Sequence, residues 1–184
     1  MKKPITYLIC TGLIMLLCGC NCSKTTNHIP PVKNFDLSRY LGKWYEIARL
    51  PNNFEKNITN AYAEYTMLPD GKVQVVNSGI RNRQITSVTG QAYLAKASDV
   101  GLLKVSFFYP FYATYKIIYL NRDYTTAIVT GDSMNYLWIL ARSETISPEE
   151  LALLLNLLRE WGFEPNLLQY PYGILNLAPH NRVL

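Results

Sequence analysis

The sequence predicts an all-β fold, an eight-stranded antiparallel up-and-down barrel with one C-terminal α-helix packed against its outside. Three observations support this prediction. Short β-rich runs are separated by turn residues, no run between them is long enough for a crossover helix, and one capped amphipathic segment follows the last run. Consecutive strands joined by short turns pair antiparallel, and eight such strands can close into a barrel.

The eight expected strands follow one another from residue 41 onward. Turn residues such as Pro69-Asp70-Gly71 and Asn121-Arg122-Asp123 separate them. The expected strands cover residues 41–50, 59–67, 72–80, 85–95, 102–108, 114–120, 124–130 and 135–142.

The expected helix begins after Ser147, which suits an N-cap, with Pro148 at the first helical position and Glu150 completing a capping box. After this start, apolar residues recur at helical spacing: Leu151, Leu154, Leu155, Leu158 and Trp161. Gly162 is suited to end the helix. Because one amphipathic helix is not stable alone, we expect this stripe to lie against the outside of the sheet.

The N-terminus predicts an export signal over residues 1–19. The basic start is followed by an uncharged, mostly apolar run at 5–17, which is shorter than the ~20 residues of a membrane-spanning helix. Leu17-Cys18-Gly19-Cys20 resembles the bacterial lipoprotein lipobox, in which the cysteine after a small residue is acylated and becomes the first residue of the mature chain. A plain signal peptide cut elsewhere is the alternative.

Acylated Cys20 would tether the protein to a membrane. We expect a lipidated polar linker at 20–34 and the barrel domain at 35–184. In the lipoprotein pattern an Asp after the cysteine favours the inner membrane, so Asn21 favours the outer one. The expected location is the cell outer membrane, lipid-anchored and facing the periplasm.

Composition and motifs argue against several other classes of function. The formal charge is +5, or +3 without Lys2 and Lys3, which is too small and scattered for nucleic acid. The two histidines, His28 and His180, lie outside the expected strands, and no nucleotide or hydrolase motif is present. We therefore expect no catalytic residue, no metal, no cofactor and no enzyme activity.

Alternation along the strands assigns an inward face. Lys72 and Gln74 should face water, which points Val73, Val75 and Asn77 inward. The same argument places further residues inside: Ala61, Ala63, Tyr65, Val105, Phe107, Tyr115, Ile117 and Tyr119. The small residues in this inward set favour a partly empty lumen with room for one ligand, and a core filled by side chains is the alternative.

Three segments resemble the lipocalin signatures, in the order the family has them. Residues 42–49, Gly-Lys-Trp-Tyr-Glu-Ile-Ala-Arg, resemble the first, Asn121-Arg122-Asp123-Tyr124 the second, and residues 137–142, Leu-Trp-Ile-Leu-Ala-Arg, the third. The resemblance covers roughly residues 34–169. With the lipobox, the chain resembles the bacterial outer-membrane lipoproteins of the lipocalin family, which are related to apolipoprotein D.

This resemblance implies binding of fatty acids or lysophospholipids. It places Trp44 at the closed end of the barrel with the Arg142 guanidinium across its ring, a structural role. It also implies ligand contacts from Tyr65, Asn77, Phe107 and Trp138, in agreement with the alternation argument, which adds Tyr115. The alternative for each of these residues is a side chain that only fills the barrel core and contacts no ligand.

Other interpretations stay open. Phe108, Tyr109, Phe111 and Tyr112 surround Pro110 and suggest the mouth, a membrane-contacting rim or a self-association surface that would make a homodimer. An envelope interaction lipoprotein with a filled barrel is one alternative function, and a lipocalin-fold enzyme is another, with Glu46 expected near the sealed end and Glu64 outward. A siderophore or haem pocket would need inward cations or iron ligands, and the expected lumen has none.

Overall fold

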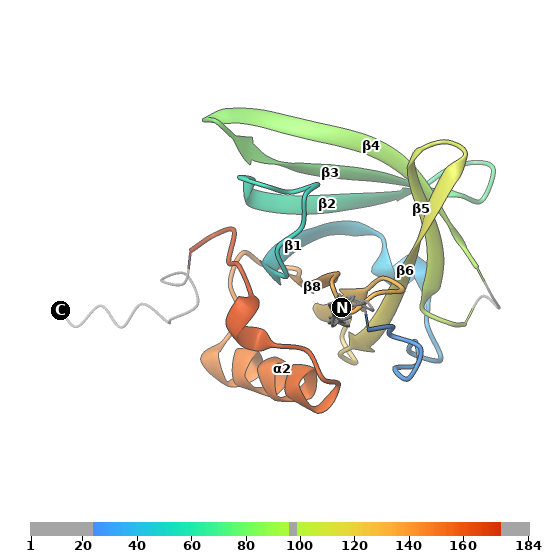
Figure 1. The fold of residues 1–184 in the computed structure, drawn as a ribbon. Coiled ribbons are helices and arrows are strands. Elements are labelled where there is room, and N and C mark those ends of the chain that lie inside the picture. Colours follow the sequence, from blue (N-terminus) through green and yellow to red (C-terminus); the bar gives the residue numbers. More distant parts are fainter. Residues whose placement is uncertain (1–23, 96–98, 174–184) are drawn as a thin grey trace, which may run out of the picture.

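The computed structural model describes residues 24–95 and 99–173, and the expected signal segment and Cys20 lie outside these ranges. Each strand pairs antiparallel with the next, and the last pairs with the first, which closes the barrel and confirms the predicted fold class (Figure 1). The strands are β1 Gly42–Arg49, β2 Thr59–Met67, β3 Val73–Arg81, β4 Gln84–Leu94, β5 Leu102–Phe108, β6 Phe111–Leu120, β7 Thr126–Thr130 and β8 Leu137–Ala141.

Strands β6, β7 and β8 begin two or three residues away from their expected starts. Strand β6 starts three residues early, at Phe111, because the β5–β6 hairpin continues to a pair between Phe108 and Phe111. Strand β7 starts two residues late. Tyr124 lies in the preceding turn at φ 60°, and the Asn121 side chain accepts hydrogen bonds from the Thr125 and Thr126 amides there.

A short helix before the barrel was not expected from the sequence. Helix α1 spans Leu37–Tyr40, with Asp36 as N-cap accepting a hydrogen bond from the Ser38 amide. It carries Tyr40 into the closed end of the barrel, where 1% of that residue remains exposed. The capping residue is visible in the sequence, but four residues show too little periodicity to predict a helix.

Helix α2, Pro148–Glu160, lies on the outside of the barrel as predicted (Figure 1), and the 3₁₀ turn η1, Pro165–Leu167, follows it. The Ser147 hydroxyl accepts a hydrogen bond from the Glu150 amide, the N-cap half of the predicted box. The Glu150 carboxylate instead accepts a hydrogen bond from the Thr126 hydroxyl, which ties the helix to β7. Leu154 and Leu158 are fully buried against the sheet.

Strand β8 is apolar on both faces because two clusters share it. Leu137, Ile139 and Ala141 pack in the outer cluster with α2. Trp138 and Leu140 pack in the inner cluster, which fills the inside of the barrel toward its closed end. The inner cluster also contains Phe35, Tyr40, Trp44, Ala63, Tyr65, Val73, Val75, Ala92, Leu103, Ile117, Tyr124, Ala127 and Val129.

The inward assignment of Tyr119 was wrong. The pairing of β6 with β7 shifts register between Ile117 and Tyr119, which leaves Ile117 inside and turns Tyr119 toward the helix side. Such a bulge inserts one residue and reverses the alternation beyond it. Neither the turns nor the hydrophobic pattern marks its position.

The described part of the expected linker lies along the outside of the barrel. The Thr26 amide donates to the Asp132 carbonyl, and the Val32 amide donates to the Ile117 carbonyl. Lys116 faces outward as expected, but the segment covers it, and its Nζ donates to the Thr26 carbonyl at 2.8 Å. Burial lowers the pKa of Lys116. Within the described ranges, no helix is long and apolar enough to span a bilayer.

Candidate functional site

Trp44 and Arg142 meet at the closed end of the barrel. The Arg142 guanidinium carbon lies 4.0 Å from the centre of the Trp44 ring, and the ring is fully buried. The Trp44 indole donates to the Tyr40 carbonyl at 2.8 Å, and Arg142 donates to the carbonyls of Lys43 and Arg39, both at 2.8 Å. One guanidinium therefore joins β8, the start of β1 and α1 beneath the lumen.

Three tyrosines form the floor above this pair. The Tyr115 hydroxyl lies 2.7 Å from the Tyr40 hydroxyl and 2.9 Å from the Tyr65 hydroxyl. Burial raises the pKa of Tyr40 and Tyr115 well above the ordinary value and that of Tyr65 to about 12, so all three are neutral near neutral pH. Tyr65 and Tyr115, both expected ligand residues, thus use their hydroxyls on one another.

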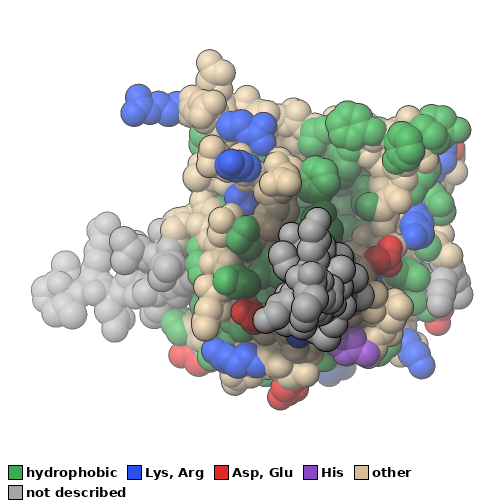
Figure 2. Space-filling view, in the orientation of Figure 1, with side chains coloured by type: hydrophobic (Ala, Val, Ile, Leu, Met, Phe, Trp, Pro, Cys, Tyr) green, Lys and Arg blue, Asp and Glu red, His purple; other side chains and the backbone are tan. Residues whose placement is uncertain are grey.

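The inward residues nearer the other end are less covered. Asn77 and Val88 face each other across β3 and β4, and Val88 remains 43% exposed although it lies on the inward face. Phe107 on β5 and Trp138 on β8 are also only partly buried. Figure 2 shows hydrophobic side chains lining a hollow in this face of the molecule. The lumen is therefore packed at its base and open above it.

A buried ionic group lies in the wall between floor and mouth. Glu46 lies two residues after the inward Trp44 and shares its face. A register shift between Glu46 and Ala48 turns Arg49 inward as well, and the two side chains form an ion pair at 2.5 Å. The Arg49 guanidinium also donates to the carbonyls of Glu55 and Ile58, which fixes the β1–β2 connection. The expectation that Glu46 lies near the sealed end, and that the lumen has no inward cation, was wrong.

The Glu55 carboxylate links this group to the upper wall. It accepts a hydrogen bond from the Trp138 indole at 2.9 Å, and the Trp138 ring stacks with Tyr136 at an interplanar angle of 11°. Burial, and then the nearby charge of Glu55, raise the pKa of Glu46 well above its ordinary value, although Arg49 opposes the shift. The sequence could not reveal this network because the β1 bulge reverses the alternation.

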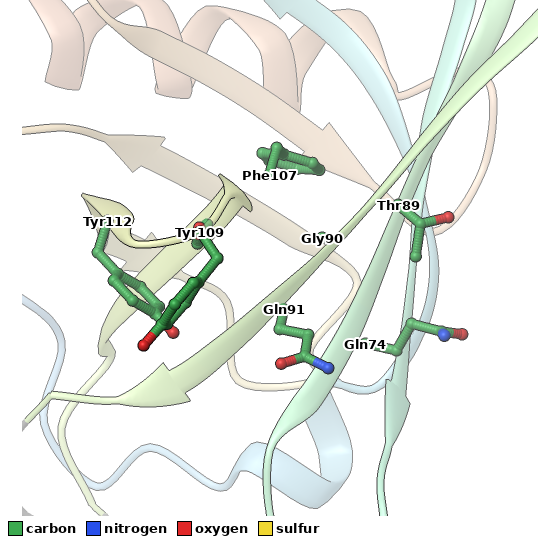
Figure 3. Close-up of a pocket in the computed structure, with 8 residues that line it drawn as sticks. Gln74, Thr89, Gly90, Gln91, Phe107, Tyr109 and Tyr112 are labelled. Atoms are coloured by element: carbon green, nitrogen blue, oxygen red, sulfur yellow. The ribbon is translucent and has the colours of Figure 1, made fainter.

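A second recess lies on the outer surface beside the β5–β6 hairpin. Its volume is about 250 Å³, and Figure 3 shows Gln74 and Gln91 from neighbouring strands with Tyr109 and Tyr112 side by side at the hairpin. Phe107 also borders it, next to Gly90. Gln74, Thr89 and Gln91 alternate with the inward residues of β3 and β4, so most of this lining lies on the outer face of the sheet.

Two arginines lie at the end of the β3–β4 hairpin. Arg81 and Arg83 are exposed, and the Arg81 guanidinium donates to the Phe54 carbonyl at 3.1 Å. This contact joins the β3–β4 and β1–β2 connections, which lie at the same end of the barrel.

An up-and-down barrel of eight strands, sealed at one end by a Trp–Arg pair and open at the other above an apolar lumen, is the architecture of a lipocalin. The family model described as "Lipocalin-like domain" matches residues 35–172. The chain belongs to this family.

Named relatives span most of the chain. The outer membrane lipoprotein Blc of Vibrio cholerae is 37% identical over 171 residues, which cover 91% of this chain and 97% of the relative. That of Citrobacter freundii is 41% identical over 155 residues, covering 83% and 88%. Apolipoprotein D of Bos taurus is 32% identical over 149 residues, covering 74% and 76%.

Solved structures show the same fold. Insecticyanin from the tobacco hornworm Manduca sexta superimposes with a TM-score of 0.66 at 20% identity, over 83% of this chain and 88% of that one. At this level of identity the likeness concerns the fold alone.

Proposed function

We propose that this protein is a membrane-anchored lipocalin that binds fatty acids or lysophospholipids and stores or transports them at the outer membrane. The observation that carries the proposal is the partly exposed inward face formed by Val88, Phe107 and Trp138 above a packed floor. The names of the bacterial relatives, outer membrane lipoproteins, support the location.

The size of the hydrophobic effect suits a carrier. Transferring a chain of ~16 carbons into an apolar lumen gains roughly 12 kcal/mol at ~0.8 kcal/mol per CH₂. Lost rigid-body freedom takes back at least ~4 kcal/mol, which leaves a dissociation constant of roughly micromolar or a little tighter. Such an affinity allows both loading and release.

The proposed ligand contacts divide into wall and floor. Asn77, Phe107 and Trp138 form the wall, where the acyl chain enters. The chain would end on the rings of Tyr65 and Tyr115, because their hydroxyls are already paired with each other. We propose that the lumen binds a ligand and does not catalyse a reaction. Glu46 accepts a hydrogen bond from Arg49, and Glu55 accepts hydrogen bonds from Asn52 and Trp138. Neither carboxyl is therefore left free as an acid or base.

A fluorescence titration tests the binding proposal. Lysophospholipid added to the protein should change the Trp138 emission saturably, and the Trp138→Phe variant identifies the share due to Trp138 against Trp44 and Trp161. A flat titration at accessible lipid concentrations would refute the carrier and favour an interaction lipoprotein with a filled barrel.

The anchor is a separate part of the proposal. Acylated Cys20 would hold the protein in the outer membrane, since several acyl chains bind a bilayer firmly. The Cys20→Ala protein should be absent from the membrane fraction, whereas the matched Cys22→Ala protein should remain in it. Retention of Cys20→Ala protein in membranes would remove this claim.

A further inference from the structure

The most exposed large apolar side chains of the described residues gather at one end of the barrel. Each of five is more than 70% exposed, and each lies in or beside the β1–β2, β3–β4 or β5–β6 connection: Phe54, Ile85, Phe108, Tyr109 and Phe111. In an up-and-down barrel these alternate connections share one end, the mouth of the lumen. We call these five residues the apolar rim. Figure 2 shows hydrophobic side chains gathered over the β5–β6 hairpin, beside the hollow.

The connections at the closed end are different in kind. The β2–β3 turn contains Pro69-Asp70-Gly71, and the Asp70 carboxylate pairs with Lys72 at 2.8 Å. The β6–β7 turn consists of Asn121-Arg122-Asp123, in which Arg122 and Asp123 are exposed. The side chains that are more than 70% exposed therefore lie at the mouth, whereas Met67, beside the β2–β3 turn, is 42% exposed. Contiguous exposed apolar patches mark interaction surfaces.

The chain reaches the barrel at this same end. The Lys24 carbonyl accepts a hydrogen bond from the Met134 amide at 2.8 Å, in the β7–β8 connection. The Asp132 carbonyl accepts from the Thr26 amide, and the Asp132 carboxylate accepts from the Thr114 hydroxyl at 2.6 Å, two residues from Tyr112. Three residues lie between Cys20 and Lys24, and the four steps of chain from one to the other span at most ~14 Å.

The charges at the mouth suit an anionic lipid surface. Lys56, Arg81 and Arg83 are exposed in the same connections. A basic residue near such a surface contributes ~1 kcal/mol, and aromatic side chains favour the level of the lipid headgroups. Two acidic residues at this end are already hydrogen-bonded within the protein, Glu55 to Trp138 and Asp132 to Thr114.

We propose that the apolar rim rests on the lipid layer that carries the anchor, so that the barrel mouth faces the membrane and lipid enters the lumen directly from it. This inference rests on the proposed acylation of Cys20 and adds the orientation of the barrel. The short reach from Cys20 places the mouth, and not the polar closed end, against the lipid.

The test uses the full lipidated chain reconstituted in vesicles of phosphatidylethanolamine and phosphatidylglycerol. A tryptophan is placed in the rim by Phe111→Trp and, as the matched control, at the exposed closed end by Arg122→Trp. Emission is measured with and without nitroxide-labelled lipid, and the wild-type signal is subtracted. The rim tryptophan should shift to shorter wavelength and lose emission to the nitroxide, and the Arg122→Trp emission should stay unchanged. Phe108→Trp, on the facing strand, gives a second reading if Phe111→Trp does not fold.

Each other outcome overturns the proposal in a recognisable way. Equal or stronger quenching of Arg122→Trp means that the closed end meets the lipid. A rim tryptophan that shifts with protein concentration but is not quenched means that a second copy covers the rim. Protein that does not float with the vesicles shows that anchoring itself has failed, whereas floating protein with an unquenched rim overturns only the orientation. The Trp138 titration tests lipid binding independently of both.

Discussion

The guanidinium carbon of Arg142 lies over Trp44, 4.0 Å from its ring centre, while the guanidinium nitrogens donate to the backbone of Lys43 and Arg39. The pair thereby seals the barrel and holds α1 in place. A desolvated cation–π contact contributes ~2 kcal/mol, and truncating a buried Trp to Ala costs ~3–5 kcal/mol.

Trp44→Ala should therefore lower the melting temperature far more than it changes the order of preference among lipids. Thermal unfolding and lipid titration of the same preparation measure the two effects. Unchanged melting together with an altered lipid preference would show that Trp44 is a ligand residue and not a structural one.

The tyrosine floor makes a second prediction. Tyr115→Phe removes one hydroxyl that serves both Tyr40 and Tyr65, so two hydrogen bonds are lost. At ~0.5–1.5 kcal/mol each, the free energy of unfolding should fall by about 1–3 kcal/mol. Denaturant unfolding measures it, with Tyr109→Phe, 86% exposed, as the control that should change nothing. Equal stability of both variants would argue against the paired hydroxyls.

The buried Glu46 makes stability depend on pH. Because burial and the Glu55 charge raise its pKa above 4.5, the folded protein keeps a proton that the unfolded chain has already released in the window just above 4.5. Stability must then fall as pH rises through this window toward the raised pKa.

Glu46→Gln should remove this fall, so its melting temperature relative to wild type should improve as pH rises above 4.5. Glu64→Gln, on the exposed face of β2, is the control and should follow the wild-type curve. If the Glu46→Gln and wild-type curves run parallel over the whole range, the Glu46 carboxyl is not the group responsible.

Gly90 provides a prediction about the lumen wall. A Cβ there would lie 2.5 Å from the Ser106 carbonyl oxygen and 2.7 Å from the Phe107 ring. Gly90→Ala should therefore displace β5 or Phe107, cost ~1–3 kcal/mol of stability and weaken lipid binding. At Gly131 the nearest atom to a Cβ is 3.6 Å away, so Gly131→Ala should be tolerated. Similar melting temperatures and affinities for the two variants would contradict the close packing at Gly90.

The sequence was sufficient for the architecture because alternation, turn residues and helix capping are local properties. The eight strands, the helix from Pro148 and the two-faced strand around Trp138 all follow from them. The features that the sequence did not predict depend on the pairing between strands. Bulges in β1 and β6 reversed the faces of Arg49 and Tyr119, and no local pattern marks such a bulge.

The expected ligand residues lie at two different depths in the barrel, and the sequence could not predict this because depth also depends on the pairing between strands. Alternation places Tyr65 and Phe107 on one face without telling how high in the barrel each lies. The structure places Tyr65 and Tyr115 in a hydrogen-bonded floor and leaves Asn77, Phe107 and Trp138 on the more open wall. Depth along the barrel is fixed by strand register, which the sequence does not state.

The proposed function requires the open upper lumen to hold an acyl chain. Native mass spectrometry of the protein purified from cells tests it most directly, since a buried lipid survives gentle ionisation. We expect a species heavier than the bare chain by one fatty acid or lysophospholipid, and we expect its loss when Phe107 and Trp138 are both replaced by polar side chains without unfolding. Bare protein only, even after incubation with lysophospholipid, would contradict it.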